Sequence, residues 1–341
     1  MRSEHLQYLR CPSCKNQLGI SEVHEEDTLG IATGSLRCLG CGESYPITRH
    51  VPRFVPEQNY ASGFGLQWSR HARTQHDSYT GIPLSEVRFF AETRWPRRLD
   101  GERILEVGCG SGRFTVHAAG TEAMVVSLDY SNAVDSNFAV NGHRSNVLII
   151  QCDLYAMPLS AGTFDRAFCL GVLQHTPDVH RSFQAIAGMV RSGGHLAVDV
   201  YRKPQGLRRL TTTKYWVRPL TRRIPPQHLY RLTRSYIQLM WPVARLINRI
   251  PVVGKGINWA LLIADYRGVY PLKEDHLREW AILDTFDMLA PVYDQPQALS
   301  TVRRWFEEAR FSRIDVHPGY NGIEGRGRKS PIGPDDRGDR V

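Results

Sequence analysis

A glycine-rich stretch, residues 108–112, is the segment of this chain whose residue types most clearly suit ligand binding. It reads Gly-Cys-Gly-Ser-Gly, with glycines at Gly108, Gly110 and Gly112, and Glu106 lies two positions before the first of them. Glycine lets the backbone turn sharply and approach a ligand without a Cβ in the way. A helix that starts after such a loop presents free N–H groups and the positive end of its dipole. The stretch therefore predicts a ligand-binding loop.

Carboxylates follow at the ends of the next two predicted strands. Asp129 ends the strand after the glycine loop, 23 residues beyond Glu106, and Tyr130 follows it. A carboxylate at that point can accept both hydroxyls of a ribose. Asp153 and its neighbour Leu154 come just beyond the third strand, where a carboxylate can accept from the exocyclic amine of an adenine. Because the carboxyl ends of parallel strands meet at one sheet edge, the sequence predicts a site for an adenosine-containing ligand.

Two other interpretations of this stretch compete with that prediction. A dinucleotide-dependent oxidoreductase needs the fingerprint G-x-G-x-x-G, and Arg113 stands where its third glycine would be. A plain glycine turn in a ligand-free α/β domain, with two aspartates placed by chance, is the other alternative. Three features in register favour a cofactor site over both.

Two C-x-x-C pairs near the N-terminus suit a metal ion. Their four cysteines are Cys11, Cys14, Cys38 and Cys41, and 23 residues separate the pairs. Tetrahedral zinc takes four thiolates from two tight turns, and a site filled by four cysteines is closed, so it is structural rather than catalytic. Iron–sulfur ligation and disulfides are the alternatives.

The elements that must position these residues alternate between short apolar strands and helical stretches, which is typical of βαβ units and a parallel sheet. Strands are predicted at residues 103–107, 124–129, 147–151, 164–170, 195–201 and 311–317. Helices are predicted at residues 112–120, 131–140, 178–190 and 299–310. The interval 202–298 interrupts this alternation.

Four motifs in order give the sequence a resemblance to a known family. ILEVGCGSGRFT, VVSLDYS, CDLYAMPLSAGTFDRAFCLGVLQHTPD and VRSGGHLAVDVY resemble class I S-adenosylmethionine-dependent methyltransferases, most of all the ubiquinone/menaquinone-biosynthesis group, over about residues 101–201. The resemblance implies an α/β fold: a Rossmann-like, doubly wound, seven-stranded sheet with a small N-terminal zinc ribbon and a mostly helical insertion after the fifth strand. It implies that the glycine loop borders the methionine part of the cofactor, with the ribose at Asp129, the adenine at Asp153 and the transferable methyl near Leu170. The predicted cofactor-binding set is Glu106, Gly108, Gly110, Gly112, Asp129, Tyr130, Asp153, Leu154 and Leu170.

Methyl transfer to a hydroxyl also needs a base to take the proton. His175, which follows the fourth strand, is the best candidate, although a residue at this place can also only cap a helix or shape the pocket. Weaker candidates on the same logic are His71, His76, Asp199 and Tyr201. Amine-modifying nucleic-acid enzymes of this superfamily often carry Asn/Asp-Pro-Pro-Tyr after the fourth strand, and this chain has Leu-Gly-Val-Leu there.

The domain organisation follows from these segments. We expect a zinc ribbon at 1–56, a helical lid segment at 57–100, the methyltransferase domain at 101–320 with a basic helical insertion at 202–298, and a flexible tail at 321–341. The ribbon, CPSCKNQL…LRCLGCGESYPITRHVPRF, resembles the small zinc-ribbon family that activates tRNA and release-factor methyltransferases. A folding module and a substrate-binding module are both open for it.

The insertion is strongly basic. No Asp or Glu stands between Asp199 and Asp265, whereas the same interval holds 13 Lys and Arg, Arg208 and Arg209 among them, in a chain of net charge +9. Three partners suit such a segment: a substrate under a lid, an anionic membrane surface contacted through 202–256, or, less favoured, nucleic acid.

Composition sets the remaining limits. Hydrophobic residues make up 42% and charged residues 23%, which excludes a wholly disordered chain. There is no signal-peptide core, no run of about 18 apolar residues, and the cysteines are paired as for a metal, so we expect a cytoplasmic protein, peripheral to the inner membrane face if the insertion binds lipid. No feature indicates an oligomeric state.

The sequence thus predicts a methyltransferase that acts on a small molecule, a glycan or a lipid-linked acceptor. The expected reaction is O-methylation. Looser resemblances of residues 64–68, 74–79 and 284–296 to methyltransferases of surface-polysaccharide and natural-product pathways favour those acceptors. An rRNA or tRNA methyltransferase that holds RNA with its ribbon and insertion is the alternative, and a cofactor-binding scaffold without catalysis is a third class.

Overall fold

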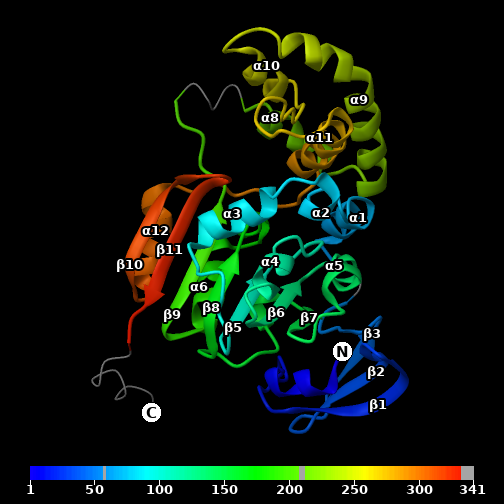
Figure 1. Cartoon of the computed structure of the whole chain (residues 1–341), viewed down its shortest axis with the longest axis vertical. Coiled ribbons are helices and arrows are strands. Elements are labelled where there is room, and N and C mark those ends of the chain that lie inside the picture. Colours follow the sequence, from blue (N-terminus) through cyan, green and yellow to red (C-terminus); the bar gives the residue numbers. More distant parts are fainter. Residues whose placement is uncertain (57–58, 207–211, 332–341) are drawn as a thin grey trace.

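The computed structural model describes residues 1–56, 59–206 and 212–331. Three parts follow one another along the long axis of the molecule (Figure 1): a small ribbon of strands, a central sheet with helices on both faces, and a helical cap. The described residues do not include two arginines of the basic insertion, Arg208 and Arg209, or the end of the predicted tail, 332–341.

The central sheet has seven strands in the order β10-β11-β9-β8-β5-β6-β7. The strands are β5 (Arg103–Val107), β6 (Met124–Asp129), β7 (Val147–Gln151), β8 (Phe164–Cys169), β9 (Val190–Val200), β10 (Phe311–Gly319) and β11 (Gly322–Lys329). Strands β5 to β9 run parallel, and β11 lies antiparallel between β9 and β10. The apolar runs of β5 to β8 are buried because helices cover both faces. The Rossmann-like methyltransferase fold predicted from the sequence is confirmed.

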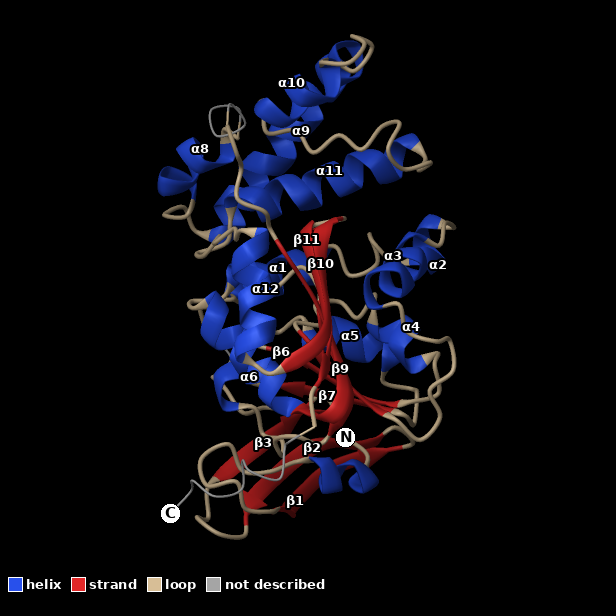
Figure 2. Ribbon diagram, turned by 90° about the vertical axis from the view of Figure 1, so that its left-hand side faces the viewer, coloured by secondary structure: helices blue, strands red, loops and turns tan. Residues whose placement is uncertain are grey.

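Helices cover the two faces of the sheet, as the edge-on view of Figure 2 shows. They are α3 (Leu84–Thr93), α4 (Thr115–Ala119), α5 (Val134–Asn141), α6 (Val179–Met189) and α12 (Leu299–Glu308), with short 3₁₀ turns η2 (Leu154–Ala156) and η3 (Leu173–His175) at strand ends. Helices α6 and α12 lie on one face, and α3, α4 and α5 lie on the other. All the strands that the sequence predicts to carry ligand-binding residues therefore end at the same edge, beneath the cap.

Strand β11 (Gly322–Lys329) lies where the sequence predicts a flexible tail, 321–341. The prediction is wrong for this part of the tail. Its alternating glycine and charged residues are typical of a disordered segment. In the structure, however, the glycines pack against a helix and a charged residue forms an ion pair. A Cβ at Gly325 or Gly327 would come within 2.7 or 2.8 Å of the Phe306 ring, so glycine lets α12 pack directly on the strand. The opposite face carries Arg326, which pairs with Asp315 at 2.6 Å. Helix packing and ion pairs, which local composition does not reveal, order this strand.

The N-terminal ribbon is an antiparallel sheet that docks on the edge of the central one. It contains η1 (Ser3–Tyr8), β1 (Leu18–Asp27), β2 (Gly30–Cys38), β3 (Ser44–Thr48) and β4 (Val51–Pro52). Beyond β4, Arg53 forms a parallel bridge with Gln151 of β7, and its guanidinium pairs with Asp135 at 2.5 Å. The Phe54 N–H also donates to the Gln151 carbonyl at 2.8 Å. The ribbon therefore covers an edge strand that would otherwise expose unpaired backbone groups.

The insertion after β9 forms the helical cap and has its own apolar core. Its helices are α8 (Lys214–Thr221), α9 (Pro226–Ile247), α10 (Gly254–Ala260) and α11 (Glu274–Leu289), and α1 (Ser62–Arg70) and α2 (Asp77–Thr80) lie beneath it. Ile237 and Trp241 of α9 pack with Phe286 of α11 in this core. The mostly helical insertion predicted from the sequence is confirmed. No helix in the described ranges is long and apolar enough to cross a membrane.

Candidate active site

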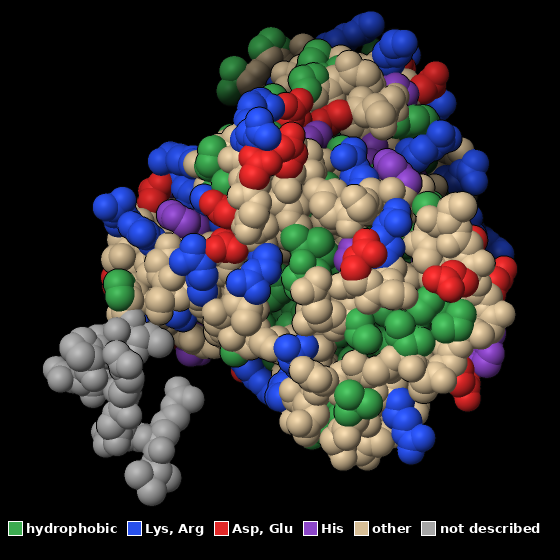
Figure 3. Space-filling model, turned by 60° about the horizontal axis from the view of Figure 1, so that its bottom comes forward, with side chains coloured by type: hydrophobic (Ala, Val, Ile, Leu, Met, Phe, Trp, Pro, Cys, Tyr) green, Lys and Arg blue, Asp and Glu red, His purple; other side chains and the backbone are tan. Residues whose placement is uncertain are grey.

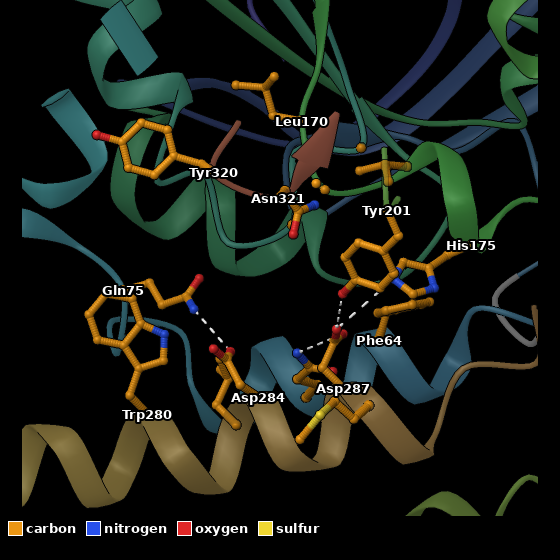
Figure 4. Close-up of a pocket in the computed structure, with 18 of the residues that line it drawn as sticks. Phe64, Gln75, Leu170, His175, Tyr201, Trp280, Asp284, Asp287, Tyr320 and Asn321 are labelled. Carbon is orange, nitrogen blue, oxygen red and sulfur yellow. Dashed lines mark hydrogen bonds and ion pairs between the residues drawn. The ribbon is translucent and has the colours of Figure 1, made fainter. Parts of the chain in front are cut away.

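One large cavity lies between the carboxyl ends of the strands and the cap. Its volume is about 1940 Å³, roughly twice the upper end of the 300–1,000 Å³ range of ordinary small-molecule pockets. The glycine loop and the ends of β6 and β8 form one wall, and α11 and the segment around α10 form the others. Figure 4 shows side chains of α11 facing Leu170 and Asn321 on the sheet side. A space of this size can hold two ligands side by side.

The glycine loop lines the cavity with backbone that only glycine can adopt there. Gly108 and Gly110 have φ angles of 79° and 52°, in the left-handed region. A Cβ at Gly108 would lie 2.3 Å from the Val172 side chain, and one at Gly110 would lie 3.1 Å from the Trp68 ring. The loop is thus held tightly between two side chains, with its backbone open to the cavity.

Asp129 ends β6 at the cavity wall and is held by the loop itself. Its Oδ2 accepts from the Gly110 N–H at 2.9 Å, and its Oδ1 accepts from the Ser131 N–H and hydroxyl at 2.8 and 2.7 Å. Burial raises the pKa of Asp129, and these donors oppose the shift. The carboxylate is therefore fixed in position while it still faces the cavity.

The other predicted residues at the strand ends also reach the cavity. Tyr130 stacks on Tyr60 with ring centroids 4.9 Å apart. Asp153 accepts from the Tyr155 N–H at 2.8 Å, which starts the turn η2. The predicted cofactor residues that line the cavity are Gly108, Gly110, Asp129, Tyr130, Asp153, Leu154 and Leu170.

Two predicted cofactor residues, Glu106 and Gly112, are not among the residues that line the cavity. Glu106 is 2% exposed and lies behind the loop, where its carboxylate accepts from the hydroxyls of Thr115 at 2.5 Å and Ser127 at 2.7 Å. A Cβ at Gly112 would lie 2.2 Å from the Asn137 side chain. Both residues therefore support the loop from behind, on the side away from the cavity.

His175 lines the cavity with one free ring nitrogen. Its Nδ1 lies 3.0 Å from the Tyr293 carbonyl oxygen, so Nδ1 carries the proton and donates to it. Its Nε2 is buried and has no hydrogen-bond partner among the described residues, and it lies 4.0 Å from Asp287. The ring centroids of Phe64 and Tyr201 each lie 5.3 Å from that of the imidazole. Figure 4 shows both rings beside His175. A neutral imidazole held in this way presents a lone pair, as a general base must.

Of the weaker candidates, only Tyr201 lines the cavity. His71 is buried beneath the cap, where Thr74 and Tyr230 contact its two nitrogens. His76 lies against Ser111, and burial lowers its pKa to about 4. Asp199 is fully buried and pairs with Arg88 at 2.5 Å.

Helix α11 supplies a polar wall that the sequence analysis did not assign to the site. Asp284 accepts from the Tyr266 hydroxyl at 2.5 Å and from Gln75 at 3.2 Å, and burial raises its pKa to about 7. Asp287 accepts from the Tyr201 hydroxyl at 3.2 Å and from Gln67 at 3.4 Å. The signal that could have found this wall is the spacing of Trp280, Asp284 and Asp287, which places three cavity residues on one helix face.

The cavity also contains a cation without an acidic partner. The Arg113 guanidinium lies 4.4 Å from the Phe114 ring centroid, and no carboxylate in the described ranges lies within ion-pair distance of it. Burial lowers its pKa to about 10, so it stays charged at neutral pH. The residue that excludes a dinucleotide fingerprint therefore offers a positive charge to a bound ligand.

The four predicted metal ligands meet in the ribbon. The sulfur atoms of Cys11, Cys14, Cys38 and Cys41 all lie within 4.8 Å of one another. Zinc–thiolate bonds of about 2.3 Å in a tetrahedron require sulfur separations of about 3.8 Å. The Gly40 and Cys41 N–H groups donate to the Cys38 sulfur, which suits a thiolate. This donor set is compatible with a structural zinc ion, and none of the four cysteines is in a disulfide.

Two segments of the chain match known protein families. Residues 105–198 match the family described as methyltransferase domain, and residues 2–49 match the family described as Trm112p-like protein. This chain carries a methyltransferase domain. It carries a Trm112p-like domain in front of it. The resemblances stated from the sequence are both confirmed.

The curated relatives match about a third of this chain. The ubiquinone biosynthesis O-methyltransferase of Marinobacter nauticus is 34% identical over 114 residues, which cover 31% of this chain and 48% of the relative. Phosphoethanolamine N-methyltransferase 1 of Arabidopsis thaliana is 28% identical over 102 residues, which cover 28% of this chain and 21% of the relative. The chain thus spans less than half the length of these relatives.

Among solved structures, the complex between the Haloferax volcanii Trm112 methyltransferase activator and a methyltransferase matches 81% of this chain and 100% of that one. It does so with a TM-score of 0.45 and 11% identity.

Removal of the metal is expected to unfold the ribbon. The ribbon contributes only a small core of its own, so four thiolates without an ion would leave its two turns unsupported. We expect one zinc per chain by elemental analysis, and loss of the ion with a lower melting temperature after chelation or in Cys38→Ser. Cys169→Ala, in a buried cysteine remote from the ribbon, should keep one zinc. Full zinc occupancy in Cys38→Ser would contradict the assigned ligand set.

The buried carboxyl behind the loop should make the stability of the methyltransferase domain depend on pH. Burial raises the pKa of Glu106 to about 7, whereas an exposed glutamate titrates near ~4.3. The folded state therefore binds this proton more tightly, and the free energy of unfolding should fall as pH rises from about 4.5 to about 7. Glu106→Gln should remove on the order of 3 kcal/mol of this fall. Denaturant unfolding of both proteins at pH 5 and pH 8 measures the change in the free energy of unfolding. An equal change in Glu106→Gln and in the unaltered protein would refute the prediction.

Proposed function

We propose that this protein transfers a methyl group from S-adenosylmethionine to an oxygen of a small-molecule, glycan or lipid-linked acceptor. The observation that carries the proposal is that one cavity contains both the adenosine-suited strand ends and the free Nε2 of His175. The matched relatives include enzymes named as O-methyltransferases, which supports transfer to oxygen.

The residues that line the strand ends would hold the cofactor. When bound, S-adenosylmethionine supplies an electrophilic methyl on a sulfonium. In this proposal Asp129 accepts from the ribose hydroxyls, Asp153 accepts from the adenine amine, and Gly108 and Gly110 let the backbone approach the methionine part. The rings of Tyr60 and Tyr130 screen the adenosine end from water.

The chain's own contribution to the chemistry would be alignment and proton removal. The Tyr293 carbonyl fixes the proton of His175 on Nδ1, so Nε2 is ready to accept the proton of an acceptor hydroxyl. Asp287, 4.0 Å from that nitrogen, would stabilise the imidazolium that results. Closure of the cap over the cavity would exclude water, which would otherwise compete with the acceptor.

The rest of the cavity favours an amphipathic acceptor. The polar wall of Asp284, Asp287 and Gln75 suits hydroxyl groups, and Trp280 beside it suits the face of a ring. The part of the lining around α10 carries the apolar side chains of Val253, Ile257 and Trp259 beside Lys255. A polar group carried on an apolar chain, such as a sugar or phenol on a lipid, fits both surfaces.

A labelling experiment tests this function and its main alternative. The protein would be incubated with methyl-labelled S-adenosylmethionine and a cell extract, which is then separated into aqueous small molecules, organic solubles and RNA. Label in a small-molecule or organic fraction, insensitive to ribonuclease and little affected by salt, supports the proposal. Label confined to a ribonuclease-sensitive fraction would overturn it.

The alternative, an RNA methyltransferase, is favoured by the Trm112p-like domain and by the basic insertion. Three observations weigh against it. Strand β1 of the ribbon carries Glu22, Glu25, Glu26 and Asp27 at exposed positions, which would repel phosphates. On the ribbon end of the molecule, turned forward in Figure 3, Lys and Arg side chains are interspersed with Asp and Glu. The ribbon is also at the opposite end from α9 and α10 (Figure 1), so the two would not form one continuous basic track.

A further inference from the structure

We propose that the outer face of α9 and α10 docks on an anionic lipid bilayer and opens the cavity toward it. This docking face consists of Leu232, Leu239, Val243, Leu246 and Ile250 along α9 and its end, Val252 and Val253 in the turn, and Ile257 and Leu261 along α10. The docking itself does not depend on the proposed function. The access that it gives to a lipid-linked acceptor does rest on that function.

The apolar residues of α9 form one stripe. Leu232, Leu239, Val243 and Leu246 follow one another at intervals of seven, four and three residues, which keeps them on one side of a helix. They are 41–77% exposed, whereas the residues on the opposite side of α9 form the core of the cap. The helix is thus apolar on both sides, and only one of them is covered by the protein.

Helix α10 extends this stripe sideways. The Asn258 amide donates to the Ala244 carbonyl at 3.0 Å, so α10 lies against the end of α9. Along α10 and the residues that flank it, exposed aliphatic side chains recur every four positions at Val253, Ile257 and Leu261. The turn between the helices contributes Val252, whose side chain is fully exposed at 101%. So many exposed apolar side chains on two adjacent helices are unusual on a monomeric protein and mark an interaction surface.

Unpaired cations border the stripe. Arg231, near the start of α9, and Arg249, two residues beyond its end, are both exposed, and neither has a carboxylate partner among the described residues. Arg245, in the last turn of α9, lies 3.7 Å from Glu274. Apolar residues flanked by arginine are the pattern of a helix that lies in the interface of an anionic membrane. A second copy of the chain fits less well, because it would bring arginines against arginines.

The docking face and the cavity share residues. Val252, Val253 and Ile257 of the docking face line the cavity, and all three are also exposed. The cavity therefore opens at the docking face, at the end of the molecule remote from the ribbon (Figure 1). A lipid-linked acceptor could pass from the bilayer into the cavity with its apolar chain still covered.

Vesicle flotation tests the proposal. The full-length, zinc-loaded protein would be mixed with vesicles of phosphatidylcholine alone or with phosphatidylglycerol added. We expect flotation with the anionic vesicles, reduced by high salt, and little with the neutral ones. The variant Leu232→Glu/Leu239→Glu/Leu246→Glu, whose residues do not line the cavity, should lose at least about tenfold in vesicle binding because charges replace the inserted groups.

Two further variants separate the causes. Arg231→Glu/Arg249→Glu should also lose binding to anionic vesicles. Val23→Glu, which replaces an exposed apolar residue of the ribbon, should bind as the unaltered protein does. Circular dichroism and the melting temperature show whether each variant folds. Undiminished flotation by the folded leucine variant and the folded arginine variant would overturn the proposal. A concentration-dependent dimer in light scattering that the leucine variant abolishes would also overturn it. Because flotation needs neither cofactor nor turnover, its result is independent of the methyl-transfer assay.

Discussion

Replacement of Asp129 by alanine is expected to weaken binding of S-adenosylmethionine by roughly 100-fold or more. Hydrogen bonds to a charged carboxylate contribute about 1.5–3 kcal/mol each, and the proposed contact to the ribose contains two of them. Loss of the carboxylate would also release the Gly110 N–H and Ser131, which hold the loop in place. Isothermal titration with S-adenosylmethionine and S-adenosylhomocysteine measures both affinities.

The Asp129→Asn variant distinguishes loss of the contact with the cofactor from loss of the hydrogen bonds that hold the loop. Asparagine keeps one oxygen for Ser131 but loses the charge and presents an amide to the cofactor, so affinity should still fall at least about tenfold. Asp178→Asn, at the N-terminus of α6 and outside the cavity, is the matched control and should leave the affinity unchanged. Normal affinity in a folded Asp129→Ala protein would show that the cofactor does not bind at this strand end.

Replacement of His175 by glutamine is expected to lower the rate of methyl transfer about 100-fold or more without changing cofactor affinity. A positioned general base contributes about 10²–10⁴ in rate, and glutamine cannot take up the proton. The ring lies beside Phe64 and Tyr201, so the change in packing is small enough for the fold to persist. Single-turnover rates provide the number, measured with the acceptor that the labelling experiment would identify.

The pH dependence distinguishes a base from a pocket-shaping residue. If His175 takes the proton, the pH–rate profile of the unaltered enzyme should have a limb that the variant lacks. His180→Gln, a surface histidine that pairs with Glu308 at 2.9 Å, should behave as the unaltered enzyme. A His175→Gln rate within a few-fold of normal, with the same pH profile, would assign the residue to shaping the pocket.

The residues at the strand ends could be located from the sequence because topology alone places them. Parallel strands bring Asp129 and Asp153 to one edge whatever else the chain does. Likewise, C-x-x-C spacing already fixes two sulfurs on one turn, so the metal ligands needed only the right pairing of turns.

Other parts of the site depend on tertiary contacts that local patterns do not contain. Glu106 was assigned to the cofactor because it stands near the glycines, but whether its side chain faces the cavity or the hydroxyls behind it depends on packing. Strand β11 was missed because its stability comes from contact with Phe306 and from ion pairs. The wall of α11 lies more than 100 residues beyond the cofactor loop, and the cap alone brings Asp284 and Asp287 to it.

The central claim is that the edge of the sheet binds a sulfonium nucleoside and not a dinucleotide. Isothermal titration of the zinc-loaded protein with S-adenosylmethionine, S-adenosylhomocysteine and NADH tests it most directly. We predict micromolar binding of the two sulfur nucleosides at one site per chain and no binding of NADH. Binding of NADH, or no binding of either sulfur nucleoside by folded protein, would contradict the account.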